Sequence, residues 1–171
     1  MDLDRHFDRR RFLHVVASAL MVSALARSRA FAADGKYEAM VLSCIDPRFQ
    51  EPVAKYTAGR QLTGKYSQFT IAGASIGVVA PAFKEWHKTF WDNLSASIQL
   101  HSIDKVIAIN HRDCGAAKIA YGEAAVADAA TETKTHRDAL AEFRKELAAR
   151  HPKLSVETGL MSLDGTLEMM S

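Results

Sequence analysis

Hydrophobic residues along the chain fall into two kinds of segment, short β-branched runs and longer amphipathic stretches. The short runs predict four strands, at residues 39–43, 67–71, 105–110 and 155–160. The longer stretches separate most of these strands and carry apolar residues at three- and four-residue steps, which predicts helices. Strands that alternate with helices form mostly parallel sheets with right-handed crossovers. The pattern therefore predicts an α/β fold, a mostly parallel β-sheet of four to five strands flanked by helices.

Two helices are clear from their apolar stripes. The first stripe should face the sheet and consists of Phe83, Trp86, Phe90, Leu94 and Ile98. The second consists of Leu140, Phe143 and Leu147, in a helix that Pro152 closes. Residues 50–65 give no clear pattern, and residues 122–133 are either a helix or a surface loop. An Asp164-Gly165 pair predicts a turn that returns residues 167–170 as a short edge strand.

The amino-terminal residues resemble a twin-arginine export signal. Arg9-Arg10-Arg11-Phe12-Leu13 precedes a moderately apolar stretch and then Ala30-Phe31-Ala32, which is typical of a cleavage site. A membrane anchor is the alternative, but the apolar stretch is shorter than the ~20 residues that a spanning helix needs. We expect a cleaved signal peptide at residues 1–32 and a domain at residues 33–171 that is periplasmic or secreted, with no stable membrane anchor after cleavage.

Charge is nearly balanced once the signal peptide is set aside. Of 22 basic and 20 acidic residues, six arginines and three aspartates lie in residues 1–32, which leaves 16 basic and 17 acidic residues. A near-neutral domain has no basic stripe for a polyanion, so we expect no nucleic-acid partner. The remaining 139 residues are enough for one domain with a single core.

Both cysteines lie in short motifs that follow apolar, β-branched runs, Cys44-Ile45-Asp46-Pro47-Arg48 and His111-Arg112-Asp113-Cys114-Gly115. Catalytic zinc takes three protein ligands, among them thiolates and imidazoles, and keeps a fourth position for water or substrate. The carboxyl ends of parallel strands gather at one edge of a sheet, where two motifs can converge on one ion. Cys44, His111 and Cys114 are therefore the expected Zn²⁺ ligands.

Cysteine usage alone favours another interpretation, a disulfide between Cys44 and Cys114, because an exported protein meets an oxidising compartment. The Asp, Arg and His at fixed offsets have no role in a disulfide, which favours the metal. Asp46 can bind that metal as a fourth ligand in a closed state, or stand beside it. Arg48 can bind the Asp46 carboxylate in a bidentate pair and keep it off the metal. The alternative is that Asp46 and Arg48 form an ordinary surface ion pair.

Three further groups remain open to two interpretations. Asp113 either orients a metal-bound imidazole or forms a turn. His87 and His101 lie on an amphipathic helix, where they are either proton shuttles or ordinary helix residues. Trp86 and Trp91 are expected to pack rather than to form a substrate box.

The two cysteine motifs resemble the signature of the β-class carbonic anhydrases, Cys-x-Asp-x-Arg followed by His-x-x-Cys-Gly, and the chain matches it at every position. The looser resemblance runs from about residue 37 to residue 120, as in a divergent, exported member. One departure lies in the middle loop, which comprises residues 70–74 between the two cysteine motifs. There the family usually has Arg-Asn-Ala-Gly-Asn, and this chain has Thr70-Ile71-Ala72-Gly73-Ala74.

The resemblance implies a carbonate dehydratase, in which zinc-bound hydroxide reversibly hydrates carbon dioxide to bicarbonate. It also implies that Asp46 and Arg48 are the catalytic dyad, with Asp46 accepting a hydrogen bond from the hydroxide. A homodimer or higher homo-oligomer is implied as well, because the family builds its pocket at a dimer interface. Two alternatives stay open, a hydrolase of carbonyl sulfide or carbon disulfide on the same site, and a zinc-binding protein without catalysis.

Overall fold

A computed structural model describes residues 37–171 of the chain, and the signal peptide expected at residues 1–32 lies outside these described residues. The elements, in chain order, are β1 (Ala39–Ser43), η1 (Pro47–Phe49), α2 (Gln50–Gly59), β2 (Tyr66–Thr70), α3 (Ser75–Val79), η2 (Pro81–Phe83), α4 (Lys84–His101), β3 (Lys105–His111), α5 (Gly115–Tyr121), η3 (Glu123–Val126), α6 (Ala129–Arg150), β4 (Ser155–Met161) and β5 (Leu167–Met169). Within the described range, no helix is both long and apolar enough to span a bilayer.

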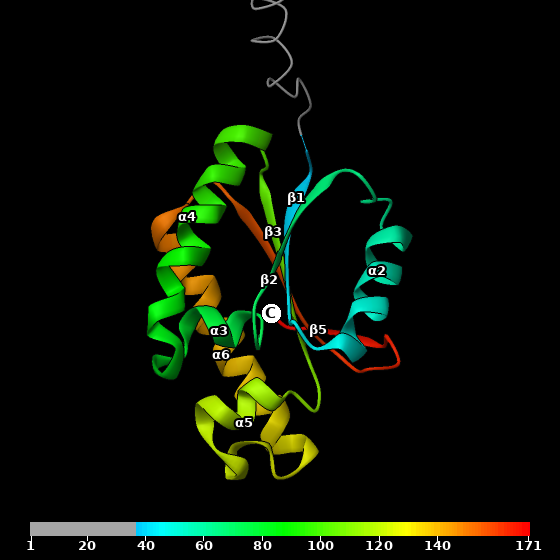
Figure 1. Ribbon diagram of the computed structural model, residues 1–171, viewed down its shortest axis with the longest axis vertical. Helices are drawn as coiled ribbons and strands as arrows, with labels where there is room; N and C mark the ends of the chain where they lie inside the picture. The colour runs from blue at the N-terminus through cyan, green and yellow to red at the C-terminus, as the bar shows by residue number, and fades with distance from the viewer. Residues whose placement is uncertain (1–36) are drawn as a thin grey trace, which may run out of the picture. The chain divides into compact units, whose positions relative to one another are not determined.

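The strands form one sheet in the order β2-β1-β3-β4-β5 (Figure 1). β1 pairs in parallel with both β2 and β3, and β3 pairs in parallel with β4 over its whole length. Only β5 runs antiparallel, at the edge beside β4. The predicted α/β fold with a mostly parallel, five-stranded sheet is therefore confirmed, including the short edge strand after the Asp164-Gly165 turn.

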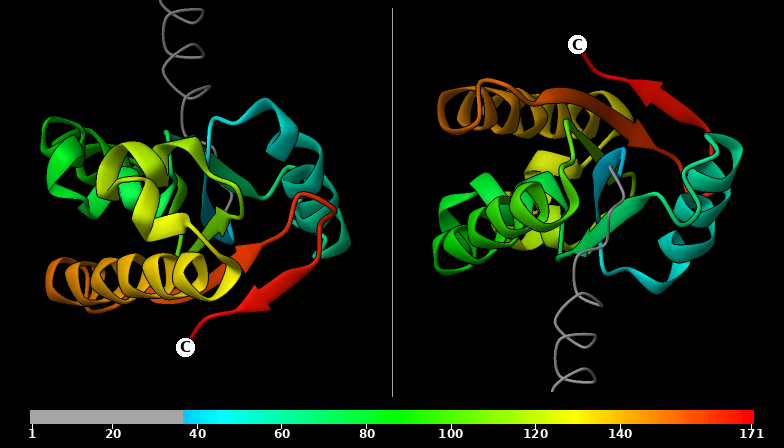
Figure 2. Two further views of the ribbon diagram at one scale, coloured as in Figure 1. Left: turned by 90° about the horizontal axis from the view of Figure 1, so that it is seen from below. Right: turned by 90° about the horizontal axis from the view of Figure 1, so that it is seen from above.

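Helices cover both faces of the sheet. Figure 2 shows α2 on one side of the strands and α4 and α6 on the other. Because successive strand residues point to opposite faces, Val41 packs into the cluster that contains Phe49 of η1 and Val53 of α2. Leu42 packs instead into the cluster with Phe90 of α4. Burial on both faces explains why β1 is apolar throughout rather than alternating.

The structure assigns two segments that the hydrophobic pattern left undecided, and it contradicts one prediction. Residues 50–65 contain α2, and residues 122–133 contain both η3 and the start of α6. Trp86 was expected to face the sheet, and this prediction is wrong, because its side chain is 39% exposed. Trp86 stacks on Phe83 at a ring-centroid distance of 4.3 Å and lines a surface groove beside the edge strand β2 and residues 71–72. Trp91 is buried and packs as predicted.

Candidate metal centre

Two strands bring the three predicted ligands together. Cys44 follows the end of β1, His111 is the last residue of β3, and Cys114 precedes the first residue of α5. Their ligand atoms all lie within 4.8 Å of one another, and all three residues are buried. Parallel pairing of β1 with β3 puts the carboxyl ends of both strands at the same edge of the sheet, as the spacing of the motifs indicated.

Two contacts fix the orientation of the His111 ring. Its Nδ1 donates to the Arg112 carbonyl at 2.8 Å, and the Phe49 ring stacks on it at a centroid distance of 4.7 Å. Among the described residues, Nε2 is buried without a hydrogen-bond partner. Burial lowers the pKa of His111, but the Cys44 sulfur and the Arg112 carbonyl outweigh it and raise that pKa. A fixed Nδ1–H leaves the Nε2 lone pair available to a metal.

The two cysteines shift each other's pKa in opposite directions. Both are free thiols rather than a disulfide. The hydrogen bond from Cys114 lowers the pKa of Cys44 well below its ordinary value, and the same contact raises the pKa of Cys114. Gly73 N–H also donates to Cys44 Sγ, at 3.2 Å. Two close sulfurs, one readily ionised, and an unpartnered imidazole nitrogen form a donor set that fits a zinc ion.

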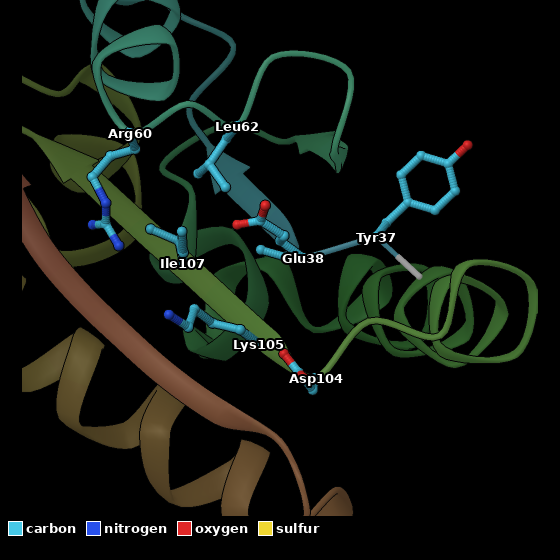
Figure 3. A pocket seen from close by; sticks show the side chains of 8 residues that line it. Tyr37, Glu38, Arg60, Leu62, Asp104, Lys105 and Ile107 are labelled. Atoms are coloured by element: carbon cyan, nitrogen blue, oxygen red, sulfur yellow. The ribbon is translucent and has the colours of Figure 1, made fainter. Parts of the chain in front are cut away.

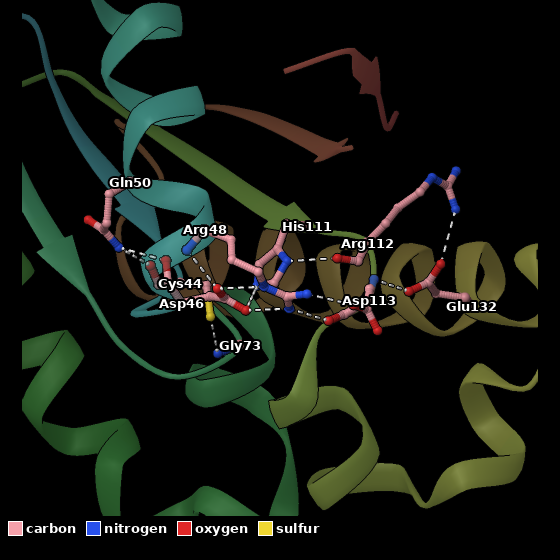
Figure 4. A network of polar contacts seen from close by, with 9 residues as sticks. All are labelled: Cys44, Asp46, Arg48, Gln50, Gly73, His111, Arg112, Asp113 and Glu132. Atoms are coloured by element: carbon pink, nitrogen blue, oxygen red, sulfur yellow. Dashed lines mark hydrogen bonds and ion pairs between the residues drawn. The ribbon is translucent and has the colours of Figure 1, made fainter. Parts of the chain in front are cut away.

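Asp46 lies beside these ligands and is turned toward Arg48 (Figure 4). Arg48 donates to its two carboxylate oxygens from Nε at 3.1 Å and from Nη2 at 2.7 Å. These hydrogen bonds lower the pKa of Asp46 to about 2, so the carboxylate is ionised at neutral pH. Asp46 Oδ2 stands 4.0 Å from His111 Nε2. Both residues of the expected dyad are therefore adjacent to the ligand cluster, with the carboxylate in a bidentate pair.

Asp113 forms the turn between the two ligands of the second motif. Its φ of 54° is in the left-handed region. Its carboxylate does not orient the imidazole, a task that falls to the Arg112 carbonyl, but accepts from Arg48 Nη1 at 2.8 Å. Arg48 lowers the pKa of Asp113 through this bond. Of the two interpretations of Asp113, the turn is the one the structure contains, together with an unexpected ion pair.

A buried polar network that sequence analysis did not identify begins at Ser75, directly after the middle loop. Ser75 donates to Asn110 Oδ1 from its backbone N–H at 3.1 Å and from its hydroxyl at 2.8 Å. Asn110 in turn donates from Nδ2 to His136 Nδ1 at 3.1 Å. All three residues are buried. The signal for this network is Asn110 itself, a polar residue inside the otherwise apolar run of β3.

Two more residues that the motifs did not indicate stabilise the turns of the site (Figure 4). Gln50 Nε2 donates to the carbonyls of Cys44 and Asp46, each at 3.1 Å. Glu132 accepts from the backbone N–H of Asp113 at 2.6 Å. Gln50 follows the first motif by two residues, so its contacts are local, whereas Glu132 comes from α6 and only the fold brings it to the site.

The two helix histidines have other partners. His101 Nδ1 lies 2.7 Å from the Ser67 hydroxyl, where α4 ends beside β2, and its ring contacts Tyr37 ahead of β1. His87 Nε2 lies 3.0 Å from the Ala80 carbonyl. His101 is therefore placed near the amino ends of the strands, whereas the ligands lie at their carboxyl ends.

A second hollow, of about 290 Å³, opens at the amino ends of β1 and β3 (Figure 3). Its lining includes Arg60 and Lys105, and both of these cations pair with the Glu157 carboxylate, at 2.9 and 2.7 Å. This hollow carries charged residues without cysteine or histidine in its lining. The candidate chemistry therefore lies at the other end of the sheet.

The fold and the Cys-His-Cys cluster together define a β-carbonic-anhydrase-like α/β protein. A family model described as "Putative carbonic anhydrase" matches residues 35–156, and the chain belongs to this family, as a divergent member of the β-carbonic anhydrases. An uncharacterized protein of Rickettsia bellii is 31% identical over 131 residues, which cover 77% of this chain and 80% of that protein. An uncharacterized protein of Rickettsia conorii is 30% identical, over 77% of this chain and 70% of that protein.

Solved structures show the same fold at low sequence identity. The β-carbonic anhydrase CafA of Aspergillus fumigatus has a TM-score of 0.55 and 16% identity, over 94% of this chain and 91% of that chain. A tetrameric β-carbonic anhydrase of Sordaria macrospora has a TM-score of 0.57 and 12% identity, over 95% and 98%. The β-carbonic anhydrase CcaA has a TM-score of 0.58 and 11% identity, over 95% and 98%.

Proposed function

We propose that this protein is a zinc-dependent carbonic anhydrase, a carbonate dehydratase that interconverts carbon dioxide and bicarbonate. The observation that carries the proposal is the arrangement of Asp46. The carboxylate lies 4.0 Å from His111 Nε2, and Arg48 holds it in a bidentate pair. Three ligands with a carboxylate held beside them leave a fourth position for a reacting oxygen.

Cys44, His111 and Cys114 would hold the zinc ion. When bound, zinc supplies Lewis acidity that makes a hydroxide nucleophile available near neutral pH. Burial of the three residues keeps competing water away from the ligand atoms. The Gly73 N–H and the His111 Nδ1–H contact fix the Cys44 sulfur and the imidazole in place before the metal arrives.

Asp46 would act as a hydrogen-bond acceptor for the nucleophile. Because Arg48 lowers its pKa to about 2, Asp46 is an acceptor without a proton of its own at neutral pH. An oxygen that donates its hydrogen to Asp46 turns a lone pair toward the substrate carbon. Arg48 keeps the carboxylate in that role, so removal of either charge should lower the rate without removing the ligands.

The altered middle loop is the reason to consider a second candidate, hydrolysis of carbonyl sulfide or carbon disulfide. A groove of about 390 Å³ lies beside this loop, lined by Ile45, Phe69, Thr70, Ile71, Ala72, Trp86 and Thr89. Such a lining has no charged side chain and suits a linear, uncharged molecule, which describes both sulfur compounds as well as carbon dioxide. The same nucleophile would attack the carbon of either sulfur compound, so the substrate has to be decided by assay.

Assembly and location are parts of the same proposal. Homo-oligomerisation is supported by the tetrameric neighbour from Sordaria macrospora and by the position of β2 at an open edge of the sheet. Export through the twin-arginine route is supported by Arg9-Arg10-Arg11 and the apolar stretch after it, and cleavage after Ala32 by Ala30-Phe31-Ala32. Cell fractionation with a twin-lysine variant at Arg10 and Arg11 tests export, and light scattering tests assembly.

Stopped-flow hydration of carbon dioxide by the purified protein, with its zinc content measured in parallel, tests the activity. We expect about one zinc per chain and fast hydration, and a loss of about 10²-fold or more in Asp46→Asn with the zinc retained. Zinc without hydration would reject the carbonic anhydrase proposal, and the sulfur substrates would then be assayed. Loss of zinc in Asp46→Asn would show that Asp46 is a metal ligand and would reject its role beside the metal.

A further inference from the structure

Glu132, in the first turn of α6, contacts the turn that joins His111 to Cys114 (Figure 4). Its Oε1 accepts from the Asp113 N–H at 2.6 Å, whereas its Oε2 lies 3.4 Å from Arg112 Nη1. The Glu132 side chain is only 12% exposed. A shielded carboxylate costs free energy unless it is hydrogen-bonded, and its shorter bond goes to the turn.

We propose that Glu132 is a positioning residue for the metal centre, which acts through Asp113 and Arg48 to keep Asp46 directed away from the metal. This inference rests on the proposed function, because it concerns the fourth position of the same site. It assigns a role to a helix that lies outside both cysteine motifs.

The first step of the argument is the backbone of the turn. Asp113 has a φ of 54°, a conformation that a residue other than glycine adopts at a cost in free energy. Arg112 N–H already donates to the Met161 carbonyl at 3.0 Å. Asp113 N–H lies after the end of β3 and before the start of α5, so neither element supplies it with an acceptor. Glu132 supplies that acceptor and thereby stabilises the turn.

The second step is the contact of the turn with Arg48. Asp113 offers two acceptors, its carboxylate to Nη1 at 2.8 Å and its carbonyl to Nη2 at 3.1 Å. The side chains of Arg48 and Asp113 are 50% and 62% exposed. At such exposure an ion pair contributes little, because ordering two mobile side chains offsets the attraction. A turn already fixed by Glu132 removes part of that ordering cost.

The third step leads to Asp46. Arg48 donates to the Asp46 carboxylate from Nε and Nη2 and to Asp113 from Nη1 and Nη2, so the two acidic residues hold the cation between them. If Arg48 loses its anchor at Asp113, Asp46 is freer to turn toward the ligand cluster, which begins 4.0 Å away at His111 Nε2. A carboxylate at the metal would occupy the fourth position.

The test uses the full chain loaded with Co²⁺ in place of zinc, because cobalt absorbs visible light and its spectrum reports the ligands. Azide is the probe, since it binds the metal only when the fourth position is free. In Glu132→Ala we expect cobalt to bind as in the wild type and the azide affinity to fall by about tenfold. Glu132→Gln keeps an oxygen for the Asp113 N–H, so it should bind azide like the wild type.

Two further variants separate positioning from damage to the fold. Glu142→Ala removes a carboxylate of the same helix that pairs with Lys145 three residues along, and should leave the azide affinity unchanged. Asp46→Ala, added to Glu132→Ala, removes the competing carboxylate and should restore azide binding. Unchanged azide affinity in Glu132→Ala, or no recovery in the double variant, would overturn the inference. Because neither readout involves carbon dioxide, a wild type that binds azide without hydrating carbon dioxide would reject the proposed function alone.

Discussion

The Gly73 N–H donates to the Cys44 sulfur across 3.2 Å, which ties the altered middle loop directly to a ligand of the metal centre. The loop has lost the polar side chains that the resemblance led us to expect. A backbone donor needs no particular side chain, so this contact forms although the loop reads Thr70-Ile71-Ala72-Gly73-Ala74.

Replacing Gly73 by alanine should weaken both the fold and the metal site. Gly73 has a φ of 79°, and an added Cβ would lie 3.1 Å from the Cβ atoms of Ala116 and Ile76. We expect a loss of about 1–3 kcal/mol in the free energy of unfolding, measured in urea, and a lower zinc affinity. Gly122→Ala is the control, since Gly122 also has a positive φ, of 87°, but open space around it. Equal losses and equal zinc affinity in the two variants would contradict this account.

Each cysteine should be needed for zinc. Replacing Cys44 or Cys114 by serine removes a thiolate from a three-ligand set, and we expect elemental analysis to show a zinc content near zero with the fold retained by circular dichroism. Ser43→Ala is the matched control, because Ser43 is buried beside Cys44 and its hydroxyl has no hydrogen-bond partner within the described residues. That variant should keep its zinc. A full complement of zinc in either cysteine variant would argue against the proposed ligand set.

Local sequence pattern was enough for the sheet and for the positions of the ligands. β1 and the centre of β3 are apolar runs because helices bury both of their faces, and Cys44 and His111 come at the carboxyl ends of these two strands. Trp86 shows the limit of the method, because the period of a helix cannot tell where the sheet beneath it ends.

Contacts between distant elements were beyond the sequence. Glu132 reaches Asp113 from α6, and Asn110 joins Ser75 to His136 across the core. Their side chains have no spacing that relates them to either motif. Only the packing of α3 and α6 beside β3 brings these groups to the site, and that packing depends on the whole fold.

Acid should remove the stabilisation that Asp46 gains from Arg48. The pKa of Asp46 is lowered from 3.8 to about 2, chiefly by the hydrogen bond from Arg48. A lowered carboxyl pKa stabilises the native state above the ordinary value, and this contribution is lost as the pH falls from about 4 to about 2. In urea unfolding of metal-free protein, the gap between wild type and Asp46→Asn should be full at pH 6 and should narrow in this acid range. A gap that is constant with pH would refute the coupling.

The buried His136 should make stability fall at higher pH than Asp46 does. Burial, and then the charges of His111 and Arg112, lower the pKa of His136 from 6.5 to about 4. Its Nδ1 accepts from Asn110, which also requires the unprotonated ring. In the unfolded chain His136 therefore binds a proton near pH 6.5, whereas in the native state it binds one only near pH 4. The free energy of unfolding consequently declines as the pH falls through this window.

The expected decline is on the order of 3 kcal/mol, from 1.36 kcal/mol for each pH unit of the window. His136→Gln carries no titrating ring at this position, so the stability of the metal-free variant should vary less with pH between 6.5 and 4 than that of the wild type. Urea unfolding at closely spaced pH values measures both slopes. If the two proteins lose stability in parallel across that window, His136 is protonated in the native state and the buried Asn110 contact does not hold it neutral.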